Sequence, residues 1–150
     1  MDPIETLLAI EGVKRCKAEY FRCIDEQDWD GLVANFTPDA ETDMRDGVEP
    51  HNPDLLSRDP KAFAANNAIV LGGVKTAHFG YMPQIDVLSP TEATAIWSME
   101  DWLWIEEGNP VLPAGRMHGW GHYFDRYTKV GDRWLMSATK LTRIKIEYRA

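Results

Sequence analysis

The change in character at Val74 constrains the fold more than any other feature of this sequence. Before Val74, apolar residues recur at helical spacing, and after it come runs rich in β-branched and aromatic residues, separated by turn residues. These runs are Lys75–Met82, Gln84–Leu88, Glu92–Ile105, Arg116–Val130 and Arg133–Tyr148. Helices followed by consecutive antiparallel strands are typical of an α+β fold. The sequence therefore predicts three N-terminal helices packed on a strongly curved, mostly antiparallel sheet, a cone with an internal pocket.

Capping signals delimit the three helices. Asp2, Pro3 and Glu5 form an N-cap, a first-turn proline and a capping-box acid, which predict a long helix from Pro3 to about Asp25. A short second helix is expected over Trp29 to Asn35, after the cap Asp28 and before Thr37-Pro38. The third begins at Asp59-Pro60 and ends at Gly72-Gly73.

The rest of the chain gives no sign of a second domain. Residues 45–58 contain Gly47, Pro50 and Pro53 and are expected to form an exposed loop or lid. A doubly wound fold would need helices between the strands, and none is visible after Gly73. With 150 residues, we expect a single domain over 1–150.

Charge and hydropathy limit the partners. Lys plus Arg number 16 against 24 for Asp plus Glu, a net charge of −8, which argues against a nucleic-acid partner and disfavours strongly anionic ligands. Arg143 or Arg116 remains able to receive one carboxylate. No basic region followed by an apolar stretch opens the chain, and no window is long and apolar enough to span a membrane. We expect a soluble cytoplasmic protein without a membrane partner.

Neither the cysteines nor a histidine pair indicates special chemistry. Cys16 and Cys23 are about 10 Å apart along a helix, too far for a disulfide, and read as small core residues. His118 and His122 share a strand face, but no third ligand stands at a motif-like spacing, and Gly119-Trp120-Gly121 between them suggests close packing. No cofactor fingerprint is present, so we expect neither metal nor cofactor.

One carboxylate interrupts an apolar row. Residues two apart on a strand share a face. One face of the third run carries Ala93, Ala95, Trp97, Met99, Asp101, Leu103 and Ile105. A buried ionised carboxylate is costly unless it is paired, and Arg143, expected on one face of the last strand with Leu135, Ser137, Thr139 and Leu141, is the candidate partner. The alternatives are a bend that leaves Asp101 in solvent, or a purely architectural ion pair.

Three further residues are candidates for proton chemistry. His78 has the side chain best suited to proton transfer at neutral pH, and its row neighbours Thr76 and Gly80 are small, leaving room above it. Tyr20 and Asp25, near the end of the first helix, offer a phenol and a carboxylate. They lie about 140° apart on an ideal helix, so they converge only if the helix frays at Asp25. The structural alternatives are a satisfied strand histidine, a core tyrosine and a polar helix end.

Short segments along nearly the whole chain resemble the SnoaL-like branch of the nuclear transport factor 2-like superfamily. They are Tyr20 to Asp25, Trp29-Asp30, Phe36 to Ala40, His78 to Pro83 and Trp134-Leu135. Within that branch, the polar positions look most like those of bile-acid dehydratases, a pattern matched here by Tyr20, Asp25, His78, Asp101 and Arg143. The resemblance implies an α+β cone around an apolar pocket, with ketosteroid isomerisation, dehydration, dehydrochlorination or polyketide cyclisation among the family's activities.

Together these features suggest a cofactor-independent lyase or isomerase that moves a proton on a hydrophobic, polycyclic ketone, enone or alcohol. In a dehydration His78 would transfer the proton, Asp25 would orient the imidazole and Tyr20 would hydrogen-bond the developing charge. Asp101, held by Arg143, would assist. The alternatives are a polyketide cyclase that needs no leaving hydroxyl, and a noncatalytic small-molecule-binding or enzyme-supporting subunit.

The opposite face of the third and fourth runs is expected to mediate self-association. Its large side chains are Ile96, Trp102, Trp104, Trp120 and Phe124. If the other rows fill the core, these residues form an outward apolar patch that a monomer rarely leaves exposed to water. The sequence therefore predicts a homodimer or homotrimer packed through the sheet, as the resemblance also implies. A register slipped by one residue would instead place them inside.

Overall fold

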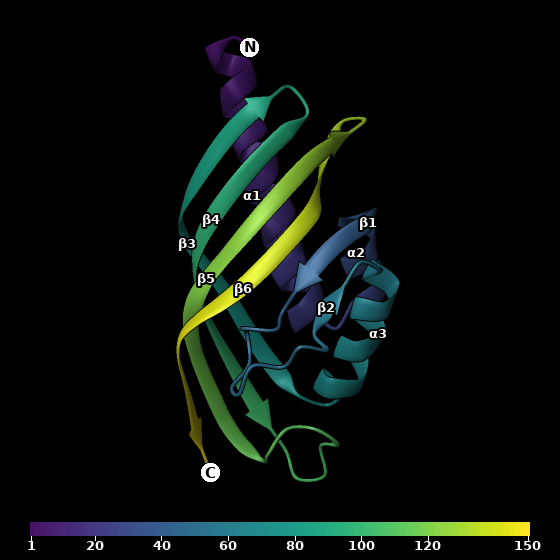
Figure 1. The fold of residues 1–150 in the computed structure, drawn as a ribbon, viewed down its shortest axis with the longest axis vertical. Coiled ribbons are helices and arrows are strands. Elements are labelled where there is room, and N and C mark those ends of the chain that lie inside the picture. Colours follow the sequence, from purple (N-terminus) through teal and green to yellow (C-terminus); the bar gives the residue numbers. More distant parts are fainter.

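A computed structural model describes residues 1–150, and its strands form one bent sheet around a long helix (Figure 1). The elements are α1 (Pro3–Asp25), α2 (Trp29–Ala34), β1 (Phe36–Asp43), β2 (Leu56–Ser57), α3 (Pro60–Leu71), β3 (Lys75–Ser89), β4 (Glu92–Ile105), β5 (Gly115–Val130) and β6 (Arg133–Arg149). The sheet order is β2-β1-β6-β5-β4-β3, and only the β1–β6 pair is parallel. Helix α1 lies across the concave side, while α2 and α3 flank β1 and β2 (Figure 1). The α+β fold with three helices on a curved, mostly antiparallel sheet is confirmed.

Local capping explains the helix boundaries. The Asp2 carboxylate accepts hydrogen bonds from the amides of Ile4 and Glu5, and the Glu5 carboxylate accepts one from the Asp2 amide, completing a capping box. α3 begins with the cap Asp59 before Pro60, and Gly72 follows its last residue. The predicted extents of α1 and α3 are confirmed, and α2 ends one residue earlier than predicted.

Strand β1 was not predicted. Thr37 and Pro38, interpreted as a helix stop, lie inside it. Proline cannot donate to a sheet ladder, but β1 pairs with β6 only at Phe36 and again from Glu41 onward, so Pro38 falls in an irregular stretch where it costs no ladder bond. The predicted loop 45–58 is also partly wrong, because residues 56 and 57 form β2 beside β1.

The two predicted strands around Pro83 are one continuous strand, β3. The pairing with β4 shifts register between Tyr81 and Gln84, where Met82 has a φ of 38°. This bulge absorbs Pro83 without ending the strand, because a residue in a bulge need not donate to the ladder.

The core lies between α1 and the concave face of the sheet. Every residue of the predicted apolar row of β4, including Asp101, is buried. The predicted row of β6 is wrong in its first half: the register shifts between β5 and β6 near Ser137, so the buried side chains are Trp134 and Met136 before the shift and Thr139 and Leu141 after it. Arg143 nevertheless keeps its predicted inward orientation.

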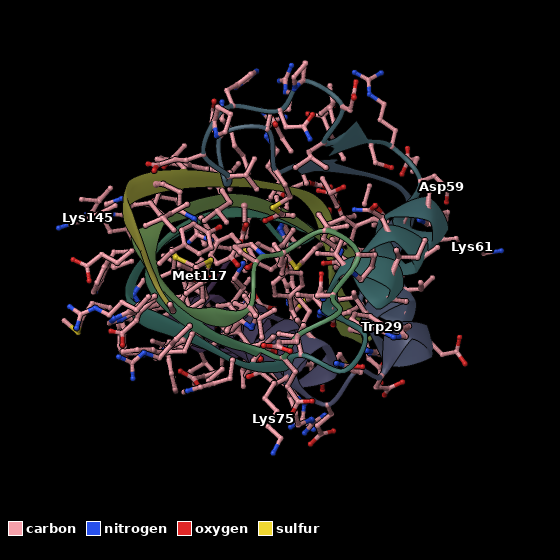
Figure 2. All side chains as sticks on the ribbon, turned by 90° about the horizontal axis from the view of Figure 1, so that it is seen from below. Trp29, Asp59, Lys61, Lys75, Met117 and Lys145 are labelled. Atoms are coloured by element: carbon pink, nitrogen blue, oxygen red, sulfur yellow. The ribbon has the colours of Figure 1, made fainter.

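Seen from below, the sheet curls around an interior into which Met117 points, whereas Lys75 and Lys145 point away from it (Figure 2). On the outer face Ile96, Trp104 and Phe124 are exposed, as the predicted register requires. Cys16 and Cys23 are free and buried, and burial raises the pKa of the Cys16 thiol to about 12. No helix has the length and apolar character needed to cross a membrane.

Candidate functional site

The end of α1 is tied to the start of β3, and this brings two of the predicted residues together. After Asp25 the chain leaves the helix, and Gln27 adopts a left-handed backbone with a φ of 57°. Its side-chain amide donates to the carbonyl oxygens of Leu71 (2.6 Å) and Val74 (3.0 Å), which fixes the helix end beside the α3–β3 junction. Gln27 was not predicted as a site residue, because nothing in the local pattern shows which distant carbonyls its side chain will meet.

The Asp25 carboxylate accepts three hydrogen bonds from β3. Its Oδ1 atom lies 2.7 Å from Nδ1 of His78 and 2.8 Å from the Thr76 hydroxyl, and its Oδ2 atom accepts from the backbone amide of His78 at 3.1 Å. Three donors fix the carboxylate in position and with it the plane of the imidazole. Thr76 was predicted only to leave space, yet it is one of the groups that orient Asp25.

The same contacts determine which nitrogen of His78 is free to react. A carboxylate only accepts hydrogen bonds, so Nδ1 of a neutral His78 carries the proton and Nε2 keeps its lone pair. Nε2 faces Oδ2 of Asp101 at 3.9 Å, too far for a hydrogen bond. His78 is 9% exposed and Asp25 is 27% exposed. The arrangement leaves a base at Nε2, oriented by one carboxylate and close to another.

Asp101 and Arg143 form the predicted ion pair. Nη1 and Nη2 of Arg143 lie 2.7 and 2.9 Å from the two oxygens of Asp101, and both side chains are nearly fully buried. Burial lowers the pKa of Arg143, but the hydrogen bonds and charge of Asp101 outweigh it and leave the pKa raised. The geometry is the bidentate one that compensates best for removing two charges from water.

The remaining donors of Arg143 are also largely occupied. Nε donates to the carbonyl of Gly47 at 2.9 Å, and Nη1 also lies 3.5 Å from the sulfur of Met99. Arg143 therefore links Asp101 to the loop between β1 and β2, and it has little capacity left to receive a carboxylate. Arg116, the other candidate, lies on the outer face, 5.4 Å from the Trp102 ring.

Tyr20 does not join Asp25. It is 1% exposed and packs edge to face against Tyr123 with ring centroids 6.0 Å apart. The helix stays regular to Asp25, so the two side chains keep their separation around the axis. Burial, the nearby charge of Asp125 and that of Asp101 raise the pKa of the Tyr20 hydroxyl, which remains a hydrogen-bond donor at neutral pH.

The space that the small neighbours of His78 were predicted to leave above the imidazole is occupied on one side by Phe21. The Phe21 ring lies nearly parallel to the imidazole, 14° from it, with centroids 6.3 Å apart. It occupies the space left by Gly80, where a β-carbon would stand only 2.8 Å from Phe21. Apolar packing from α1 thus limits the approach to His78 from this side.

A second buried charge cluster was missed by the sequence analysis. Nζ of Lys17 lies 2.8 Å from Oδ2 of Asp125 and 3.5 Å from the centroid of the Tyr123 ring. Asp125 also accepts hydrogen bonds from Tyr127 (2.8 Å) and Thr139 (2.7 Å). Lys17 lies in the row of α1 residues whose spacing predicts burial, but a lysine in such a row is ordinarily interpreted as solvent-exposed.

The histidines on β5 lie away from this site. His118 on the outer face stacks between Trp102 and Trp120, with centroids 3.4 and 3.8 Å away. A small hollow of about 150 Å³ beside it is bordered by Trp102, Arg116, Glu147 and Arg149. No group of three or more His, Cys, Asp or Glu side chains gathers in metal-binding geometry.

Comparison with known proteins relates the chain to one domain family and to one fold. Residues 5–140 match the family model described as a SnoaL-like domain. The protein named Probable cyclase FGR4, from Gibberella zeae, is 26% identical over 147 residues, which span 88% of this chain and 89% of that protein.

Solved structures agree on the fold. A candidate scytalone dehydratase from Novosphingobium aromaticivorans is 18% identical, with a TM-score of 0.81 over 99% of this chain and 93% of that one. The hexachlorocyclohexane dehydrochlorinase LinA-type3 from Novosphingobium barchaimii is 16% identical, with a TM-score of 0.78 over 99% and 95%.

Proposed function

Because this chain belongs to the SnoaL-like domain family, we propose that it is a cofactor-independent lyase or isomerase that transfers a proton at Nε2 of His78. The observation that carries the proposal is the 2.7 Å contact between Nδ1 of His78 and Asp25, which leaves Nε2 as a base. The proposed substrate is a hydrophobic, polycyclic small molecule of the steroid or polyketide type.

The proposed mechanism for a dehydration uses His78 twice. Nε2 takes a proton from a carbon made acidic by a conjugated carbonyl, and Asp25 stabilises the imidazolium that forms. The imidazolium then returns the proton to the departing hydroxyl, so that water leaves and a carbon–carbon double bond forms. An isomerisation follows if the proton returns to another carbon of the substrate.

The other site residues have supporting roles. Asp101, 3.9 Å from Nε2, adds negative charge beside the imidazolium, and Arg143 holds it in place. The proposed role of Tyr20 is to donate a hydrogen bond to the charge that develops on the substrate oxygen. With Arg143 already paired, the charges at the site favour an uncharged substrate over a carboxylate.

Cyclisation of a polyketide is the second candidate, favoured by the relative named as a cyclase. It requires the same base at His78, which would generate a carbanion that attacks a carbonyl of the same molecule, but no leaving hydroxyl. The products distinguish the two reactions, because dehydration releases water and a cyclase forms a ring.

The test is turnover of steroid enones, hydroxylated polyketides and halogenated alicyclic compounds by the wild type and by His78→Ala. General acid–base catalysis contributes about 10²–10⁴-fold, so we expect a loss of that size with the variant still folded. Asp25→Asn should lose less, because the imidazole remains but its orientation changes. Undiminished turnover by His78→Ala would refute the assignment, and binding without turnover would favour a noncatalytic binding or supporting subunit.

We also propose that the chain forms a homodimer or homotrimer through the outer face of the sheet. Ile96, Trp104 and Phe124 are 36–44% exposed there, and they continue into the Trp102–His118–Trp120 stack. A second copy of the same face would remove these rings from water.

A further inference from the structure

A hollow unconnected with the assigned roles lies between α1 and the strands β3 and β4. It has a volume of about 200 Å³. Its walls are formed by Lys14, Lys17, Ala18, Phe21, Gly80, Pro83 and Trp97. His78 is not among them, although the Phe21 ring lines the hollow and has its centroid 6.3 Å from that of the imidazole.

Phe21 is the residue shared by the hollow and the surroundings of His78. One face of its ring lies parallel to His78, with centroids 6.3 Å apart, while the ring also lines the hollow. Gly80 makes this position possible, because a β-carbon there would stand 2.8 Å from Phe21 and 3.1 Å from Trp97. The Phe21 ring is therefore shared by the hollow and the surroundings of the proposed base.

The walls indicate the class of molecule that fits. The two lysines bring cations, but each is already paired: Lys14 with Glu11 at 2.7 Å and Lys17 with Asp125 at 2.8 Å. The other walls are aromatic, aliphatic or glycine, so the hollow offers apolar contact and no unpaired charge. An apolar protein cavity of about 150 Å³ binds benzene, so about 200 Å³ suits one or two rings.

We propose that this hollow is a binding site for an uncharged molecule of one or two rings, and that Phe21 keeps it apart from His78. The Phe21 ring limits how far a ligand bound at His78 extends along α1. This role of Phe21 rests on the proposed function. Removing the Phe21 ring extends the hollow toward His78 and admits a longer ligand.

Titration of the ¹⁵N-labelled protein with indole tests the hollow itself, without any turnover. We expect shifts at the amides of Ala18 and Gly80 and at the indole N–H of Trp97. Ala18→Leu, which places a larger side chain at the hollow, should weaken binding at least tenfold, whereas Arg15→Leu on the exposed surface of the same helix should not. Shifts confined to other regions, or equal binding by Ala18→Leu, would overturn the site.

Phe21→Ala tests the role of the Phe21 ring. Fluorescence titration with 2-naphthol and the longer 6-phenyl-2-naphthol should show that the variant gains at least tenfold for the longer probe and less than threefold for the shorter one. Phe21→Leu, a milder change, should gain less and serves if Phe21→Ala does not fold. Adding Ala18→Leu should cancel the gain. Equal changes for the two probes would overturn the role of Phe21 even if His78→Ala abolishes turnover.

Discussion

Gly119 of β5 lies directly opposite Asp101 of β4, and the guanidinium of Arg143 occupies the space where a side chain at position 119 would stand. A β-carbon at Gly119 would overlap Nη1 of Arg143 and Oδ1 of Asp101. The strand pairing places Arg143 opposite Gly121 instead, so its side chain crosses over Gly119 to reach Asp101. A missing side chain on the middle strand therefore permits a buried ion pair between its two neighbours.

Gly119→Ala should destabilise the protein. The added methyl group must displace a buried, charged pair or bend the sheet, and overpacking of this kind costs about 1–3 kcal/mol. Urea unfolding followed by circular dichroism measures the change. Gly108→Ala, in an exposed loop with open space around its β-carbon, is the control and should show only a backbone cost of about 1 kcal/mol. Equal stability of Gly119→Ala and the wild type would contradict the crossing geometry.

Asp101→Asn and Arg143→Met should each destabilise the fold strongly when made alone. When one of them is already present, adding the other should cost much less. Removing one partner leaves the other charge buried without compensation, which costs about 3–5 kcal/mol. The double variant Asp101→Asn/Arg143→Met leaves no uncompensated charge, so its loss should be smaller than the sum. A double-mutant cycle of unfolding free energies measures this coupling, and strictly additive losses would show that the pair is not coupled.

Residue spacing was sufficient to predict the ion pair between Asp101 and Arg143. Alternation along β4 identified Asp101 as a lone buried carboxylate, and the shared requirement for a partner identified Arg143. These predictions held because strand periodicity persists through β4 and through the part of β6 that carries Arg143. The same reasoning failed near Ser137, where a register shift exchanged the faces, because nothing in the local pattern marks a bulge.

Contacts between segments far apart in the sequence could not be predicted from local patterns. The convergence of Asp25 and His78 depends on Gln27 binding carbonyls 44 and 47 residues away, which no local pattern shows. Strand β1 was missed for a related reason: Pro38 argues against a strand unless the partner's irregular pairing is known. Tyr20 and Asp25 were predicted to converge only if the helix frays at Asp25; α1 stays helical to Asp25, and Tyr20 packs against Tyr123 instead.

Trp104→Glu should weaken self-association. Trp104 is 44% exposed at the outer face and stacks on Trp102, so a carboxylate there would be desolvated in any interface that covers the rings. Sedimentation velocity at micromolar concentration should show a dimer or trimer for the wild type and a shift toward monomer for the variant. Lys61→Glu, a charge change at an exposed position of α3 and not on the sheet, is the control. A monomeric wild type would show that the face serves another purpose.

Buried tyrosines should make the protein lose stability above pH 10. Burial raises the pKa of Tyr20, Tyr123 and Tyr127, so the folded state keeps these protons while the unfolded state, with a tyrosine pKa of about 10, releases them. The unfolded state then binds fewer protons, and the free energy of unfolding falls as the pH rises. Each tyrosine contributes about 1.4 kcal/mol per pH unit to this slope between its unfolded and folded pKa.

Tyr123→Phe isolates one of these contributions. The slope of unfolding free energy between pH 10 and 11 should be less steep than in the wild type by about 1 kcal/mol per pH unit, because a tyrosine in the unfolded state is only half ionised at pH 10. Burial lowers the pKa of Lys17, which acts in the opposite direction, but Lys17 is present in both proteins and largely cancels in the difference. Tyr81 is 46% exposed and its pKa is also raised, but the pKa of Tyr123 is raised well above its ordinary value, so Tyr81→Phe should change the slope less than Tyr123→Phe does. Identical slopes for Tyr123→Phe and the wild type would mean that Tyr123 releases its proton as easily in the folded chain as in the unfolded one.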